Sequence, residues 1–516
     1  MLLSVITFLP LVFGLALLLI PERFAKQATL LFSGLVFIAS TFILQSFDKT
    51  SASLQLVEQY KWVESVGITY FMGVDGISLW LVILTTFLTP IALMGAWSSI
   101  ETKGRAFCIS LLALETTMIG TFLAMDIVLF YVFFEASLIP MYFMIGIWGG
   151  KRRIYATVKF FIYTMAGSLL MLLGIIALMY LGAAQNGGQL TASLVDLYKV
   201  DIPFIKGEFF NTQTLLFFAF SIAFAIKCPL FPVHTWLPDA HVEAPTPGSV
   251  ILAGVLLKMG TYGFLRMVIP MFPEATAAWG WIFMFVGVFG IIYGALVAMV
   301  QPDMKKLVAY SSVSHMGYVV IGLFAWNEMG VTGGLYQMLN HGISTGALFL
   351  LVGMVYERTH SREIKDYGGL AAAAPIFAIA FLIVTMSSIA VPMTNGFIGE
   401  FFILLGAWQA SPGFAVFAVV GVVLGAAYML WMVKRVFFGQ AGPLVEKYGE
   451  GLEINRREIA TLVPLVILIF WMGLAPNHFL DWSRASLNNV VNNQYNYELA
   501  IAPEADDKKS QVAVRD

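Results

Sequence analysis

Long apolar segments follow one another along the whole chain, and no other feature limits the fold as strongly. About 20 residues of helix cross the ~30 Å hydrocarbon core of a bilayer. Hydrophobic residues make up 59% of the 516 positions and charged residues only 12%, so a water-soluble fold could not bury the apolar surface. The sequence predicts an all-α integral membrane protein with about fourteen spans, at 2–20, 28–46, 76–97, 106–124, 126–147, 154–182, 211–231, 248–270, 278–300, 304–325, 330–356, 372–409, 413–439 and 458–479.

The distribution of basic residues predicts the orientation of these spans. Most Lys and Arg lie in or beside the odd-numbered loops, those after spans 1, 3, 5 and so on. Loops rich in positive charge stay on the cytoplasmic side. An even number of spans then places both termini on the periplasmic side. The net charge of −2 argues against a nucleic-acid surface.

Two predicted spans contain helix-breaking sequences. Residues 227–241 include three prolines, and residues 391–396 include Pro392 followed by Asn395-Gly396. Proline removes a backbone donor and interrupts a helix. The breaks fall on the fourth helix of two five-helix units, spans 4–8 and 9–13, and an odd number of helices inverts the second unit. Paired broken helices in inverted repeats are typical of an ion pathway at the membrane midplane. We therefore expect N-terminal helices (1–105), a first five-helix repeat (106–270), a second, inverted repeat (278–439), and a last helix with a polar tail (440–516).

A few ionisable side chains lie where lipid-facing residues would be apolar. Each charge at the centre of a span costs ~2.5–3.5 kcal/mol unless it is paired, hydrated or neutralised. Groups of this kind, aligned at one depth, are what a proton relay requires. The expected relay residues are Glu135, Lys227, Lys258, His315, His341 and Glu400, with Glu115, Asp239 and His241 as weaker candidates. Lys159 and Arg266 lie nearer span ends, where long side chains are expected to reach the interface.

The chemistry of such a relay follows from desolvation. Burial favours the neutral form of a lysine, and a nearby carboxylate favours the charged form. Movement of Glu135 relative to Lys227 would therefore change the proton affinity of the lysine. Moving one charge against 100 mV costs ~2.3 kcal/mol. The chain contains no nucleotide-binding or metal-binding motif, so we expect no cofactor in it and an energy source in a partner.

Three stretches of sequence resemble the antiporter-like subunits of respiratory complex I. The match covers nearly the whole chain and is most specific around the first break. The matching stretches are Phe133-Phe134-Glu135-Ala136-Ser137-Leu138-Ile139-Pro140-Met141-Tyr142, Lys227-Cys228-Pro229-Leu230-Phe231-Pro232-Val233-His234-Thr235-Trp236-Leu237-Pro238-Asp239-Ala240-His241 with Glu243-Ala244-Pro245-Thr246, and Lys305-Lys306-Leu307-Val308-Ala309-Tyr310-Ser311-Ser312-Val313-Ser314-His315-Met316-Gly317.

This resemblance implies a non-redox subunit of a proton-translocating NADH:quinone oxidoreductase. NADH, FMN, iron–sulfur clusters and quinone would then be bound by partner subunits. The expected neighbours are other membrane-arm subunits, especially the antiporter-like subunits L and N, and the expected location is a bacterial inner membrane. Glu400 stands where subunits L and N typically carry lysine. One departure is Met393, because the family usually reads Leu-Pro-Gly-Thr at this break.

Other functions are compatible with the same sequence. The chain could belong to a multi-subunit cation/proton antiporter, which has no redox partner. It could also belong to a membrane-bound hydrogenase or a ferredoxin-driven complex. A purely structural subunit, whose charges only pack helices, is the alternative of another class.

Overall fold

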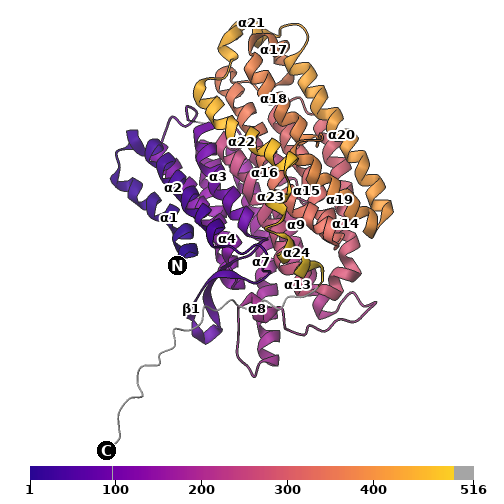
Figure 1. The fold of residues 1–516 in the computed structure, drawn as a ribbon. Helices are drawn as coiled ribbons and strands as arrows, with labels where there is room; N and C mark the ends of the chain where they lie inside the picture. The colour runs from indigo at the N-terminus through magenta and orange to yellow at the C-terminus, as the bar shows by residue number, and fades with distance from the viewer. Residues whose placement is uncertain (96, 493–516) are drawn as a thin grey trace, which may run out of the picture.

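A bundle of helices makes up almost all of the structure, a computed structural model that describes residues 1–95 and 97–492 (Figure 1). Among the described residues, one two-stranded antiparallel sheet accompanies the helices. The predicted all-α membrane fold is confirmed. Figure 1 shows α17 and α21 at one end of the bundle and β1, α8 and α24 at the other.

Eleven helical segments of the described chain are long and apolar enough to cross a membrane. Three shorter apolar helices occupy the positions of the remaining predicted spans. Length alone does not settle whether all fourteen cross, so that number stays a prediction. The long segments are α1 (Leu2–Ala16) with the turn that extends it to Leu19, α2 (Ala25–Ser46) with the turn that precedes it from Glu22, α4 (Gly104–Leu123), α5 with α6 (Ile127–Ala136, Leu138–Trp148), α7 (Arg153–Gln185), α11 to α13 (Thr246–Met271), α14 (Pro273–Met299), α15 (Met304–Phe324), α16 (Glu328–Thr359), α20 (Pro412–Phe437) and α22 (Arg456–Leu474). The shorter ones are α3 (Leu79–Gly95), α9 (Thr212–Lys227) and α18 (Pro375–Ser388).

Both predicted helix breaks are present. Helix α9 ends at Lys227, and the chain resumes as α10 (Trp236–Glu243) after a link that contains two prolines. Helix α18 is followed after six residues by α19 (Asn395–Ala410). Met393 has φ +76° in this second break, a region that glycine enters more readily than other residues. The link therefore keeps a left-handed residue although glycine is absent from it.

Two irregularities inside predicted continuous spans were not expected. The fifth span is divided at Ser137 into α5 and α6. The eighth span contains π-helical turns at Leu252–Leu256 and Phe264–Val268, on either side of α12 (Leu257–Gly263). Pro140 lies three residues after Ser137, and Pro270 lies two residues after the second π-helical turn; each lacks the N–H that would bond the carbonyl four residues earlier. The first π-helical turn has no proline in it.

The chain also forms elements outside the spans that were not predicted. Strands β1 (Gln55–Val63) and β2 (Ile68–Val74) form a hairpin. The part of the predicted C-terminal segment that follows residue 492 lies outside the described residues, and the division into two inverted repeats stays a prediction. The short helices are α8 (Leu194–Leu197), α17 (Leu370–Ala373), α21 (Pro443–Tyr448), α23 (Asn477–Leu480) and α24 (Arg484–Val491).

Three segments form the interior of the bundle and position the candidate site. Every residue in the most hydrophobic part of the segment from α11 to α13 is buried, and the same is true of α16. Almost every residue in the corresponding part of α15 is buried. These segments carry Lys258, His315 and His341. Because other helices cover them, their polar side chains face protein groups rather than lipid.

Candidate functional site

Lys258 and His341 meet in the centre of the bundle. The Lys258 Nζ atom lies 2.7 Å from Nδ1 of His341 and also donates a hydrogen bond to the carbonyl oxygen of Ala253. Lys258 is completely buried and His341 is 3% exposed. An amine and an imidazole at this distance can exchange a proton directly.

His315 and Glu400 form a second close pair. The His315 Nδ1 atom lies 3.1 Å from Oε1 of Glu400, across the contact between α15 and α19. Gln337, on α16, donates a hydrogen bond of 3.1 Å from Nε2 to the same carboxylate oxygen. Both members of the pair are buried, and the carboxylate can receive a proton from the histidine.

A short gap separates these two pairs. The ring centroids of His315 and His341 lie 5.8 Å apart, and the Nε2 atom of each ring has no hydrogen-bond partner within the described residues. Both rings line a cavity of about 10 Å³, together with Asn340 and Ser388. A polar cavity of this size accommodates about one water molecule, and one water can bridge the two histidines.

Glu135 and Lys227 are near each other but do not form a direct ion pair. Lys227 donates a hydrogen bond of 3.2 Å from Nζ to Oγ of Ser137, and its Nζ lies 4.7 Å from the centre of the Phe134 ring. The Oε1 atom of Glu135 has no hydrogen-bond partner in the described chain. The expected glutamate–lysine pair is therefore not in contact in this conformation. The lysine amine donates its hydrogen bond to the Ser137 hydroxyl instead.

The three weaker candidates form no hydrogen bond with the Lys258–His341 or His315–Glu400 pairs among the described residues. Glu115 is completely buried in α4, and neither carboxylate oxygen has a hydrogen-bond partner among the described residues. The His241 ring stacks on Phe349 at 4.6 Å between centroids. Asp239 forms an ion pair of 2.8 Å with Lys159. Lys159 is 20% exposed and Asp239 30% exposed, so the expectation that the Lys159 side chain reaches the interface stays a prediction.

Asp239 also lines a pocket at the first break. The pocket has a volume of about 200 Å³, and the chain segments around it come from both halves of the bundle. Its charged lining residues are Arg152, Asp239, Glu243, Asp303, Lys306 and Arg362. Three carboxylates and three basic side chains line the pocket, and a pocket with such a lining can hold water.

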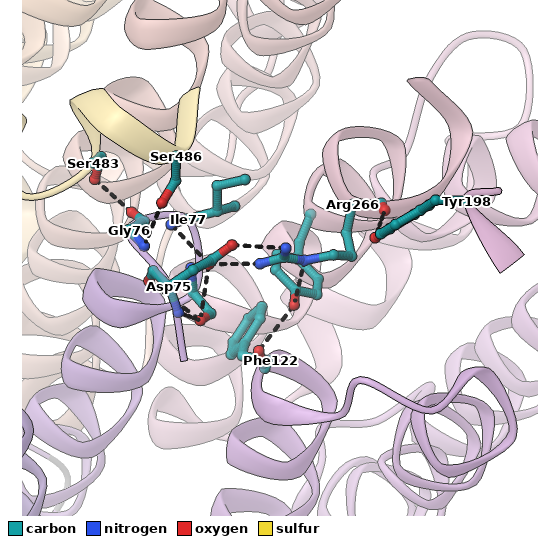
Figure 2. A network of polar contacts seen from close by, with 10 residues as sticks. Asp75, Gly76, Ile77, Phe122, Tyr198, Arg266, Ser483 and Ser486 are labelled. Carbon is teal, nitrogen blue, oxygen red and sulfur yellow. Dashed lines mark hydrogen bonds and ion pairs between the residues drawn. The ribbon is translucent and has the colours of Figure 1, made fainter. Parts of the chain in front are cut away.

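The structure corrects the expected position of Arg266. Its guanidinium is 1% exposed and forms a buried ion pair with Asp75 (Figure 2). Sequence reasoning missed this pair because the two residues are 191 positions apart. One signal in the sequence could have indicated it. Asp75 and Arg266 both lie at span ends that are predicted to face the same side of the membrane, and they carry opposite charges.

The described residues contain no group of three or more His, Cys, Asp and Glu side chains that could hold a metal ion. Cys108 and Cys228 are buried and free. The expectation that cofactors reside in partner subunits stays a prediction.

Broken helices around a central lysine, two histidines and a glutamate define this chain as an antiporter-like membrane subunit. A family model described as NADH:quinone oxidoreductase/Mrp antiporter matches residues 124–425, and one described as the amino terminus of NADH-ubiquinone oxidoreductase chain 4 matches residues 3–121. The chain belongs to the family of NADH-quinone oxidoreductase subunit M and NADH-ubiquinone oxidoreductase chain 4.

Individual relatives agree with this assignment. NADH-quinone oxidoreductase subunit M of Rhodobacter capsulatus is 46% identical over 98% of this chain and 99% of its own length. A chain of respiratory complex I from Thermus thermophilus has a TM-score of 0.83 at 33% identity, covering 95% of this chain and all of that one. The Mrp complex of a Dietzia species has a TM-score of 0.81 at 21% identity, over 96% of this chain and 98% of that one, and shares the fold.

Proposed function

We propose that this chain is a proton-pumping, antiporter-like subunit of NADH:quinone oxidoreductase and that its proton path runs through Lys258, His341, His315 and Glu400. The observation that carries the proposal is the contact of 2.7 Å between Lys258 and His341, in a region where an unpaired charge would be costly. The role of this subunit would be translocation, with the redox chemistry in its partners.

The separated pair of Glu135 and Lys227 supplies the switch. With Glu135 distant, desolvation favours release of a proton from Lys227; with Glu135 close, the carboxylate favours its retention. A charge displaced in a neighbouring subunit would move Glu135 between these positions. Protons would be collected at the pocket around Asp239 and passed, through His241 and Lys227, to Lys258.

Quinone reduction elsewhere in the complex would drive this cycle. Subunits L and N are the proposed neighbours, and NADH, FMN, iron–sulfur clusters and quinone would be bound by other subunits. The proposed location is a bacterial inner membrane, with both termini on the periplasmic side. The 46% identity to a subunit M over 98% of this chain favours this assignment over a cation/proton antiporter, because the similarity to the Mrp complex, at 21% identity, supports the fold alone.

The test replaces Lys258 by methionine in the assembled complex, because methionine keeps the length of the side chain and removes the amine. Lys434→Met is the matched control, since Lys434 is exposed at the end of α20. We expect fewer protons translocated per electron in vesicles with Lys258→Met and an unchanged ratio with Lys434→Met. An unchanged ratio in Lys258→Met would refute the proposed path. Co-purification with flavin and iron–sulfur proteins separates complex I from an antiporter.

A further inference from the structure

A buried ion pair joins the helix that carries Lys258 to the turn between β2 and α3. Arg266 donates from Nη1 to Oδ2 of Asp75 at 2.7 Å and from Nη2 to Oδ1 at 2.6 Å. The side chains are 1% and 0% exposed. Two parallel bonds between a guanidinium and a carboxylate fix distance and orientation together.

Further hydrogen bonds hold the guanidinium end of this pair (Figure 2). Arg266 donates from Nε to the Tyr262 hydroxyl at 3.1 Å, and that hydroxyl donates to the carbonyl oxygen of Phe122 at 2.9 Å. The Tyr198 hydroxyl donates to the Arg266 carbonyl oxygen at 2.7 Å. The side chain of Arg266 is thus held by Asp75 directly and by Phe122 through the Tyr262 hydroxyl, and its backbone is held by Tyr198.

The carboxylate end is fixed by the C-terminal segment. Gly76, next to Asp75, donates from its backbone N–H to Oγ of Ser486 at 3.0 Å and accepts a bond of 2.5 Å from Oγ of Ser483. A Cβ atom on Gly76 would lie 2.4 Å from the Trp482 carbonyl oxygen, so only glycine permits this approach. The turn that carries Asp75 is therefore held in place from outside the span.

The helix between Arg266 and Lys258 needs such an anchor. Arg266 lies in the second π-helical turn, Phe264–Val268, and the first π-helical turn precedes α12. A π-helical turn departs from the regular backbone bonding of an α-helix, so either turn offers a place where the register can change. A slip by one residue would displace Lys258 by ~1.5 Å along the axis and rotate it by ~100°.

We propose that Arg266 and Asp75 are a positioning pair that holds Lys258 in register with His341. The inference rests on the proposed function, since it assigns the pair to the Lys258–His341 contact. Arg266 lies eight residues, or ~12 Å, along the helix from Lys258 and acts through the backbone between them. Fixing the guanidinium prevents the slip and keeps the two proton-carrying atoms within bonding distance.

The experiment separates positioning from charge balance. The double variant Asp75→Leu/Arg266→Met removes both charges and leaves neither partner buried alone. Arg266→Lys keeps the charge but loses the two-pronged contact. The matched control is Arg358→Lys, because Arg358 makes an equivalent two-pronged contact with Glu458 on α22. Protons per electron and the pH profile of pumping are measured in vesicles of the assembled complex, beside Lys258→Met.

We expect Arg266→Lys to lower the proton ratio and shift the pH profile, the double variant to lower the ratio toward that of Lys258→Met, and Arg358→Lys to match the unmodified complex. Normal pumping in Arg266→Lys or in an assembled double variant would overturn the inference. If the double variant does not assemble, Arg266→Lys decides alone. Normal pumping in Lys258→Met would instead refute the proposed function, so the two failures are distinguishable.

Discussion

Gly260 sets the distance between the two lysine-bearing helices and provides the sharpest test of the relay geometry. It lies on α12, two residues after Lys258, against the end of α9 that carries Lys227. A Cβ atom at Gly260 would lie 2.7 Å from the Phe224 carbonyl oxygen and 2.8 Å from the backbone nitrogen of Cys228. These are backbone atoms, so no side-chain rotation relieves the clash.

The required displacement follows from these distances. Ordinary contact begins at 3.4 Å, so Gly260→Ala must separate α12 from α9 by at least about 0.7 Å. Overpacking of this kind costs ~1–3 kcal/mol. A misplacement of ~1 Å can slow a positioned reaction by about 100-fold. We therefore expect slower quinone reduction or fewer protons per electron in a complex that still assembles.

The matched control is Gly346→Ala on α16. The nearest atom to a Cβ at Gly346 is Cγ1 of Val250 at 3.7 Å, an ordinary contact. Turnover with NADH and proton uptake are measured on vesicles with equal amounts of assembled complex. If Gly260→Ala matches the unmodified complex in both quantities, the spacing between the lysine helices does not matter for transport.

Two further predictions concern stability outside the spans and one concerns the second pair. Asp126 accepts hydrogen bonds from the first turn of α5 through Oδ1 and from Thr69 through Oδ2, so Asp126→Ala should cost ~1–2 kcal/mol for the lost cap and lower the thermal midpoint of the purified complex; Asp126→Asn, which keeps one acceptor oxygen, should lower it less. Burial opposes ionisation of Glu58, but hydrogen bonds, above all from Ser4, lower its pKa overall. Its stabilisation is present above the ordinary value of ~4.3 and is lost as pH falls through the lower folded value, so thermal midpoints of Glu58→Gln and the unmodified protein should differ at pH 7 and converge in acid. Glu400→Gln should reduce proton release in vesicles while His315→Gln reduces it at least as much; normal release in both would exclude the pair from the path.

The sequence was sufficient to identify the membrane fold, the two helix breaks and the residues that meet in the centre, while the number of spans stays a prediction. Hydrophobic length and proline identify spans and breaks because both act locally. Lys258, His315, His341 and Glu400 were identifiable because ionisable groups are rare in spans. The structure then shows that these four form two close pairs, which composition alone cannot specify.

Other features depend on contacts between distant parts of the chain. Asp75 and Arg266 lie at opposite ends of a long stretch of sequence, and the position of Arg266 near a span end suggested a different role. The first π-helical turn beside Lys258 contains no proline, so no helix-breaking residue in the sequence marks it, whereas Pro270 follows the second turn. Lys227 donates to the Ser137 hydroxyl rather than to Glu135, and the spacing of residues along the chain does not specify which acceptor it uses.

The gap between His315 and His341 gives the path a point at which transfer can be interrupted. A continuous row of hydrogen-bonded groups would let protons leak back, whereas a gap of one water can be opened or closed by small movements of α16 against α18. Ser388→Val would fill the cavity of about 10 Å³ with an added methyl group and exclude the water. We expect this variant to assemble and to pump fewer protons per electron, while Ser388→Ala, which leaves the cavity open, pumps normally. Equal pumping by both variants would show that protons cross between the histidines without this water.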